Sequence, residues 1–102
     1  VLASSNSIIN VSNAIIEVNT NGIRVEHGST ANVENANITA TNGNGIYVRW
    51  GSIVNADGST ITGSPYGITI EDGSIVNAHN TTASLNATPN QITSRGIIFK
   101  NV

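Results

Sequence analysis

The feature that most constrains this chain is an internal repeat. A segment that starts at Gly22 (GIRVEHGS) returns at Gly45 (GIYVRWGS) and again at Gly67 (GITIEDGS). A fourth copy of its first half starts at Gly96 (GIIFKN). Repeats with a period of roughly 20–30 residues are typical of solenoids, in which each unit packs only against its neighbours.

Each unit contains three short strand patterns, of which the segment above is the first. The second occupies residues 8–11 (IINV), 30–33 (TANV), 53–56 (IVNA) and 75–78 (IVNA), and the third occupies residues 15–17 (IIE), 37–39 (NIT), 60–62 (TIT) and 82–84 (TAS). Ile, Val and Thr favour strands because branching at Cβ stiffens them. The sequence therefore predicts an all-β parallel β-solenoid of about four turns, in which every strand pairs with its equivalent one turn on.

Alternation along each strand predicts which side chains face the core. In the first strand these are Ile23, Val25, Ile46, Val48, Ile68, Ile70, Ile97 and Phe99. In the second and third strands they are Ala31, Val33, Val54, Ala56, Val76, Ala78, Ile16, Ile38, Ile61 and Ala83. A leucine-rich repeat is excluded because the chain has two leucines, and a hexapeptide solenoid is excluded because the spacing does not divide by six.

Residues 1–102 are expected to form a single β-helix segment. Because the sequence opens on Val1 and not on Met, we expect it to be a piece of a longer chain. The interval between the first-strand segments is longer after Gly67 than before it, which predicts an inserted corner loop at residues 85–95. The chain has no cysteine, four Lys or Arg residues and no apolar run of about 18 residues. These features exclude disulfides and argue against nucleic-acid partners and membrane insertion.

The pattern Gly-Ile-x-Val-x-x-Gly-Ser-x-Val-Asn-Ala resembles the right-handed, single-stranded β-helix of bacteriophage tailspikes and neck appendages. The resemblance extends over residues 7–102. It implies a segment on a virion tail or otherwise extracellular, with a non-catalytic structural and host-receptor-contact role, no cofactor and a homotrimeric state. Autotransporter passenger domains of bacterial adhesins carry similar repeats and remain an alternative. A segment of a polysaccharide-degrading hydrolase or lyase is a third.

Equivalent positions in a solenoid stack into columns, and three polar columns stand out. One is Asn10, Asn32, Asn55 and Asn77, whose side-chain amides could bond along the axis. The second is Glu26, Arg49, Glu71 and Lys100, expected as surface ion pairs worth at most about 1 kcal/mol each. The third is Ser12, Glu34, Asp57 and His79. Its carboxylates, about 5 Å apart, approach the spacing of a retaining glycosidase. We predict neither a catalytic nor a metal site there, because no aromatic subsites flank the pair and a column cannot wrap an ion.

The candidate ligand site comprises the exposed aromatic residues and one cation: Tyr47, Arg49, Trp50 and Tyr66. Aromatic rings with polar edges suit the faces of sugars, so a cell-surface polysaccharide is a possible partner. The same residue types are also typical of a subunit interface.

A second surface feature predicts association of identical chains. By alternation, Ile8, Thr30, Ile53 and Ile75 face outward and form an apolar stripe along the axis. A homotrimer would bury three such stripes around its threefold axis. In the opposing interpretation, the Gly-Ser corner resets the alternation and turns the isoleucines inward.

Overall fold

The computed structural model describes residues 1–101. These residues form twelve strands and no helix. The described chain therefore has no helix that is long and apolar enough to cross a membrane. The strands are β1 (Leu2–Ala3), β2 (Ile8–Asn10), β3 (Ile15–Val18), β4 (Ile23–Val25), β5 (Thr30–Asn32), β6 (Asn37–Ala40), β7 (Ile46–Val48), β8 (Ile53–Asn55), β9 (Thr60–Thr62), β10 (Ile68–Ile70), β11 (Ser74–Asn77) and β12 (Gly96–Phe99).

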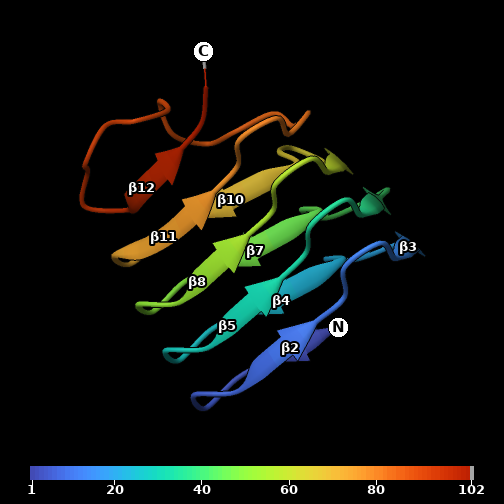
Figure 1. Cartoon of the computed structure of the whole chain (residues 1–102), viewed down its shortest axis with the longest axis horizontal. Helices are drawn as coiled ribbons and strands as arrows, with labels where there is room; N and C mark the ends of the chain where they lie inside the picture. The colour runs from blue at the N-terminus through green and yellow to red at the C-terminus, as the bar shows by residue number, and fades with distance from the viewer. Residues whose placement is uncertain (102) are drawn as a thin grey trace.

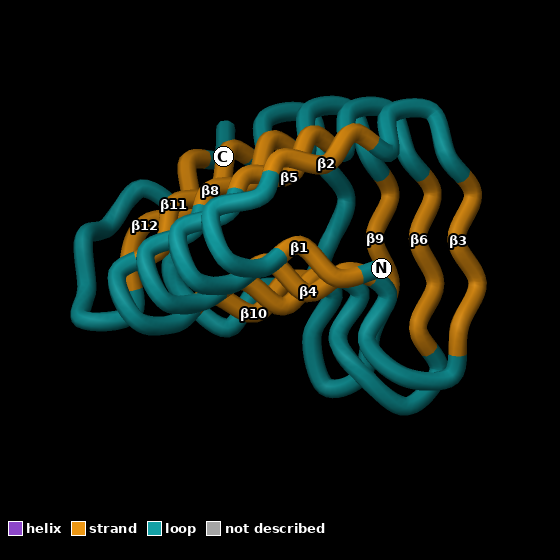
Figure 2. Tube along the Cα trace, turned by 90° about the horizontal axis from the view of Figure 1, so that it is seen from below, coloured by secondary structure: helices purple, strands orange, loops and turns teal. Residues whose placement is uncertain are grey.

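These strands form three parallel sheets that run along one axis (Figure 1). The first sheet has the order β1-β4-β7-β10, the second β2-β5-β8-β11-β12, and the third β3-β6-β9. Figure 2 shows the first and second sheets facing each other, with the third sheet closing one side. The predicted parallel β-solenoid of about four turns is confirmed.

The core lies between the sheets and consists of stacked small and β-branched side chains. In the first sheet Ile23 pairs with Ile46, which pairs with Ile68, and all three are fully buried. The six second-strand residues predicted to face inward are also fully buried, as Val54 illustrates. In the third sheet Ile38 and Ile61 are buried, whereas their counterparts in the outer turns are partly buried against the core. Alternation therefore predicted the inward face correctly for residues 23–83.

The prediction for residues 96–99 was wrong. Strand β12 pairs with β11 of the second sheet, so that Ile97 lies beside Ile75 and Phe99 beside Asn77. Ile98 is consequently the buried residue, and Phe99 is 42% exposed. Two adjacent isoleucines satisfy either alternation, so the Gly-Ile start was not sufficient to assign the strand to the first sheet.

The first-sheet position of this last turn is taken by Leu85, which forms a parallel bridge to Ile68. The side chain of Asn86 then replaces a strand: its Oδ1 accepts from the Ile70 N–H at 2.9 Å, and its Nδ2 donates to the Ile70 carbonyl at 3.0 Å. Ile97 follows its partner Ile75 by the same interval that separates Ile75 from Ile53, so this turn keeps the ordinary repeat length. Residues 85–95 thus start in the first sheet and continue as a loop to β12.

The corner between the first and second sheets explains the recurrent Gly-Ser pair. The residue before each corner glycine has a left-handed backbone, with φ of 56° at Trp50, and the glycine follows with φ of 68° at Gly51. The next serine points inward and is about 1% exposed. Its hydroxyl accepts the N–H of the serine one turn earlier: Ser29 donates to Ser52, and Ser52 donates to Ser74, each at 3.2 Å. This serine ladder satisfies buried amides at the corner.

We expect Ser52→Ala to lower the free energy of unfolding by about 1–3 kcal/mol, because the buried Ser29 N–H loses its acceptor. Denaturant unfolding monitored by circular dichroism measures the loss. Ser94→Ala, which changes an exposed serine, is the matched control and should stay within about 0.5 kcal/mol of the unmodified protein. Equal stability of the two variants would show that the ladder contributes nothing.

Candidate functional site

The outer face of the first sheet carries a group of charged side chains beside the ring of Tyr47, namely Arg24, Glu26, Arg49 and Glu71. Arg24 of β4 lies beside Tyr47 of β7, which lies beside Thr69 of β10. Two positions further on, Glu26 and Arg49 follow in the same outward alternation. The pleat places these side chains on one surface across successive turns.

Three of the four predicted ligand-site residues contact one another around Arg49. Its guanidinium carbon lies 3.6 Å from the centre of the Trp50 ring and 5.2 Å from the centre of the Tyr47 ring. The Trp50 ring also packs on His27, with 4.3 Å between ring centres. Trp50 remains 40% exposed, as expected for its corner position. Cation–π contacts of this kind fix the plane of the guanidinium group.

Glu26 lies beneath this cluster. The charged column was expected to form ion pairs at the surface, but the carboxylate of this pair is buried. Its side chain is 9% exposed, and its Oε2 accepts from Arg49 Nε at 3.0 Å. Arg24 Nη2 lies 3.3 Å from the same oxygen. Burial raises the pKa of Glu26, but the Arg49 hydrogen bond and the two positive charges outweigh it and leave the pKa below 4.5. Lys100 does not belong to this column, because it follows β12 in the second sheet.

Glu71, the next carboxylate in the column, is bound by a tyrosine. The Tyr47 hydroxyl donates to Glu71 Oε2 at 2.7 Å. Burial of Tyr47, together with the hydrogen bond and the negative charge of Glu71, raises the pKa of the phenol above 10.0, although Arg49 opposes this. Tyr47 is therefore held as a neutral hydroxyl between Arg49 and Glu71.

Tyr47 borders two surface hollows. One, of about 230 Å³, is lined by Asn21, Arg24, Tyr47 and Arg49. The other, of about 340 Å³, is lined by Asn44, Tyr47, Pro65, Tyr66, Thr69, Glu71, Asn86 and Arg95. The structure thus brings Tyr66, the fourth predicted residue, to a hollow shared with Tyr47.

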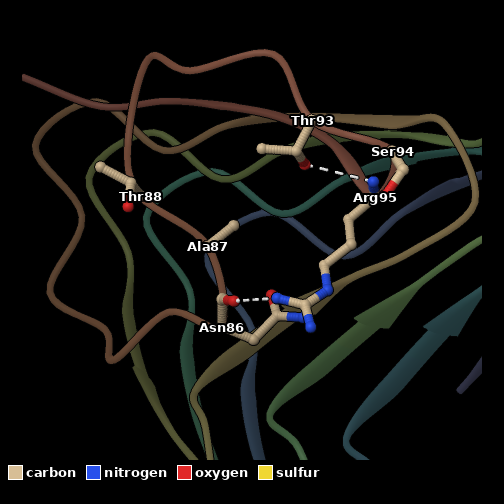
Figure 3. Close-up of a pocket in the computed structure, with 6 residues that line it drawn as sticks. All are labelled: Asn86, Ala87, Thr88, Thr93, Ser94 and Arg95. Carbon is tan, nitrogen blue, oxygen red and sulfur yellow. Dashed lines mark hydrogen bonds between the residues drawn. The ribbon is translucent and has the colours of Figure 1, made fainter.

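A third hollow, of about 310 Å³, lies in the loop after Leu85 (Figure 3). Asn86 and Arg95 line both hollows, and Arg95 Nη1 donates to the Asn86 carbonyl at 3.0 Å. Sequence reasoning did not include these two residues. The loop at residues 85–95 was the available signal, but it did not indicate that Asn86 would bond to β10. We call the three hollows with their lining residues the first-sheet track.

The other two polar columns stack as predicted within residues 1–101. Backbone hydrogen bonds link the Ser12, Glu34, Asp57 and His79 turns, and no group of metal-ligating side chains occurs in this part of the chain. The asparagine column is in register. No hydrogen bond joins its side chains in the described chain, and Asn10 instead accepts from the backbone of Ser12.

The pKa of Glu26 leads to a pH-dependence prediction. A carboxylate whose folded-state pKa is lower than its unfolded-state value stabilises the fold above the unfolded-state pKa. This stability is lost as the pH falls from 4.5 through the folded-state pKa. We expect Glu26→Gln to be less stable than the unmodified protein at pH 7, and the difference to shrink at pH 3. Urea unfolding at both pH values measures it, and a difference that does not change with pH would contradict the ion-pair geometry.

Comparison with known proteins agrees with this architecture. Searches of curated proteins and of solved structures returned no significant match. One family model, described as the right-handed β-helix region, matches residues 1–101, which is nearly the whole chain. With three parallel sheets in which each strand pairs with its equivalent one turn on, the chain belongs to the right-handed β-helix family.

Proposed function

We propose that this chain is a rigid, non-catalytic segment of a phage tailspike or tail appendage, and that its first-sheet track binds a cell-surface polysaccharide. The observation that carries the proposal is the cluster of Tyr47, Arg49 and Trp50 beside hollows that also include Tyr66. Aromatic rings with exposed faces and fixed polar groups are the usual means of binding sugars.

The track has the length and direction of an extended ligand. It runs from Arg24 on β4, past Tyr47 on β7 and Thr69 on β10, to Asn86 in the last turn. Three steps between strands amount to roughly 14 Å along the axis. A linear glycan lying along the axis would therefore contact side chains from successive turns.

Two carboxylates, Glu71 in the track and Glu26 beneath Arg49, support binding without catalysis. Glu26 is bound by two arginines, and Glu71 accepts the Tyr47 hydroxyl. General acid–base hydrolysis needs one protonated and one ionised carboxyl group on either side of the bond to be cleaved. Both carboxylates are instead used to hold neighbouring side chains in place.

Binding to an array of bacterial capsule and cell-wall polysaccharides tests this proposal. We expect the protein to bind at least one glycan without releasing new reducing ends or unsaturated products. Trp50→Asn should weaken binding by about tenfold or more, because Arg49 loses the ring on which its guanidinium group packs, while asparagine tolerates the left-handed backbone. Thr62→Ala, an exposed change on the third sheet, should bind normally. No binding, or equal binding by the Trp50 variant, would contradict the proposal, and new reducing ends would favour the hydrolase.

We also propose that three copies associate through the outer face of the second sheet. Ile8 is 82% exposed there, Ile53 39% and Ile75 40%, and they lie in one column with Thr30. The neighbouring outward column of asparagines is uncharged, so identical faces would not repel one another. Figure 2 places this face opposite the first sheet, which leaves the track free in an assembly.

Size exclusion with light scattering tests the trimer. We expect a mass three times that of the 10.5 kDa chain, and Ile53→Asp should reduce it to that of one chain. A mass of 10.5 kDa across a wide concentration range would contradict the trimer. The oligomeric state would then no longer distinguish a phage tailspike segment from an autotransporter passenger domain.

A further inference from the structure

Two guanidinium groups share one buried carboxylate at the start of the track. Arg24 lies 3.3 Å and Arg49 3.0 Å from Glu26 Oε2. The Glu26 side chain is 9% exposed, whereas the Arg24 and Arg49 side chains are 43% and 25% exposed. The Glu26 carboxylate is therefore covered by the two arginine side chains. The guanidinium groups make the surface that faces solvent positive.

Most donors of these arginines remain available. A guanidinium group carries five N–H donors. Arg49 uses Nε toward Glu26 and Arg24 uses Nη2. Within residues 1–101 no other side-chain hydrogen bond of either arginine occurs. Both residues line the hollow of about 230 Å³, together with Asn21 and Tyr47.

We propose that this hollow binds an anionic group of the glycan, either a carboxylate or a phosphate ester. Two guanidinium groups and one carboxylate leave a net charge of +1, which an anion would neutralise. Arginine binds both kinds of anion through paired N–H donors. Glu71, the nearest other carboxylate of the column, is bound to Tyr47 and lines the neighbouring hollow instead.

The residues around the hollow would hold the two arginines ready for the anion. Glu26 fixes Arg49 through Nε, and the Trp50 ring lies against the face of the same guanidinium group. Glu26 thus acts as a positioning residue, because the arginines and not the carboxylate would contact the ligand. This inference rests on the proposal that the first-sheet track binds a glycan.

Fluorescence titration of Trp50, the only tryptophan, tests the inference with three probes. These are a glucuronate-containing oligosaccharide, its methyl ester, and a phosphorylated oligosaccharide with the same backbone. We expect at least one charged probe to bind about tenfold or more tightly than the ester, and the preference to weaken at high salt. The charged probe that binds more tightly identifies the source of the anion.

Variants locate the preference at the hollow. Arg24→Gln and Arg49→Lys should each reduce the charged-over-neutral preference several-fold, whereas Lys100→Gln, which removes one positive charge outside the track, should preserve it. Equal binding of all three probes by the unmodified protein would overturn the anion site while leaving glycan binding intact. Binding of none of them, together with a negative polysaccharide array, would overturn both proposals.

Discussion

Replacing Ile46 by aspartate is expected to abolish cooperative folding of the chain. Ile46 is fully buried and pairs with Ile23 in one neighbouring turn and with Ile68 in the other. An unpaired carboxylate at this position costs several kcal/mol, or must be protonated. A domain of about this size has only about 5–15 kcal/mol of stability in total. Circular dichroism during heating should show no cooperative transition at pH 7.

Two variants control for the chemistry of this substitution. Ile15→Asp places the same charge at a position that is 77% exposed, and it should change the melting temperature by only a few degrees. Ile46→Val keeps the apolar contact and should cost about 0.5–1.5 kcal/mol. A folded Ile46→Asp protein with a melting temperature near that of Ile15→Asp would show that the first sheet presents its other face to the core.

A methyl group added at Gly45 is expected to cost about 2–3 kcal/mol, through crowding and not through backbone strain. The new Cβ would overlap Cγ2 of Ile61 and would lie 2.8 Å from the carbonyl oxygen of Gly67. That carbonyl accepts the Ile46 N–H at 2.8 Å, so it cannot move without weakening the ladder. Denaturant unfolding of Gly45→Ala measures the loss.

A double-mutant cycle identifies the clash. Ile61→Ala removes the methyl group that Gly45→Ala would meet, at the cost of a cavity. The two changes together should therefore destabilise the protein by clearly less than the sum of the single variants. Additive losses would mean that the two positions do not contact each other, and that the turns are further apart than described.

The repeat predicted most of the fold because one period carries both strand identity and register. Apolar and polar residues alternate in the first strand of each turn, as at Ile23 and Val25. One strand register then places the apolar residues of all these turns in the core. The prediction was wrong at Gly96 because Ile97 and Ile98 are both apolar, and alternation then favours neither face. The spacing from Ser74, which matches the ordinary period, was a better guide than the Gly-Ile pair.

The candidate site was predictable in its residues but not in its bonds. Columns compare only equivalent positions, so they predicted that Glu26 would lie beside Arg49. They did not predict that Arg24, two residues earlier on the same face, would bind the same carboxylate. The columns also predicted that Arg49 would pair with Glu71, whereas the carboxylate of Glu71 is bound by the Tyr47 hydroxyl. The length and direction of side chains decide these contacts, and strand patterns carry no such information.

The most direct test of the central claim is to map where a glycan contacts the protein. The measurement is a nuclear magnetic resonance titration of the isotope-labelled chain with a capsule oligosaccharide that the array identifies as a ligand. The account predicts shifts concentrated at Arg24, Tyr47, Arg49, Trp50 and Tyr66. Shifts confined to the outer faces of the second or third sheet would contradict it, as would an array that yields no ligand.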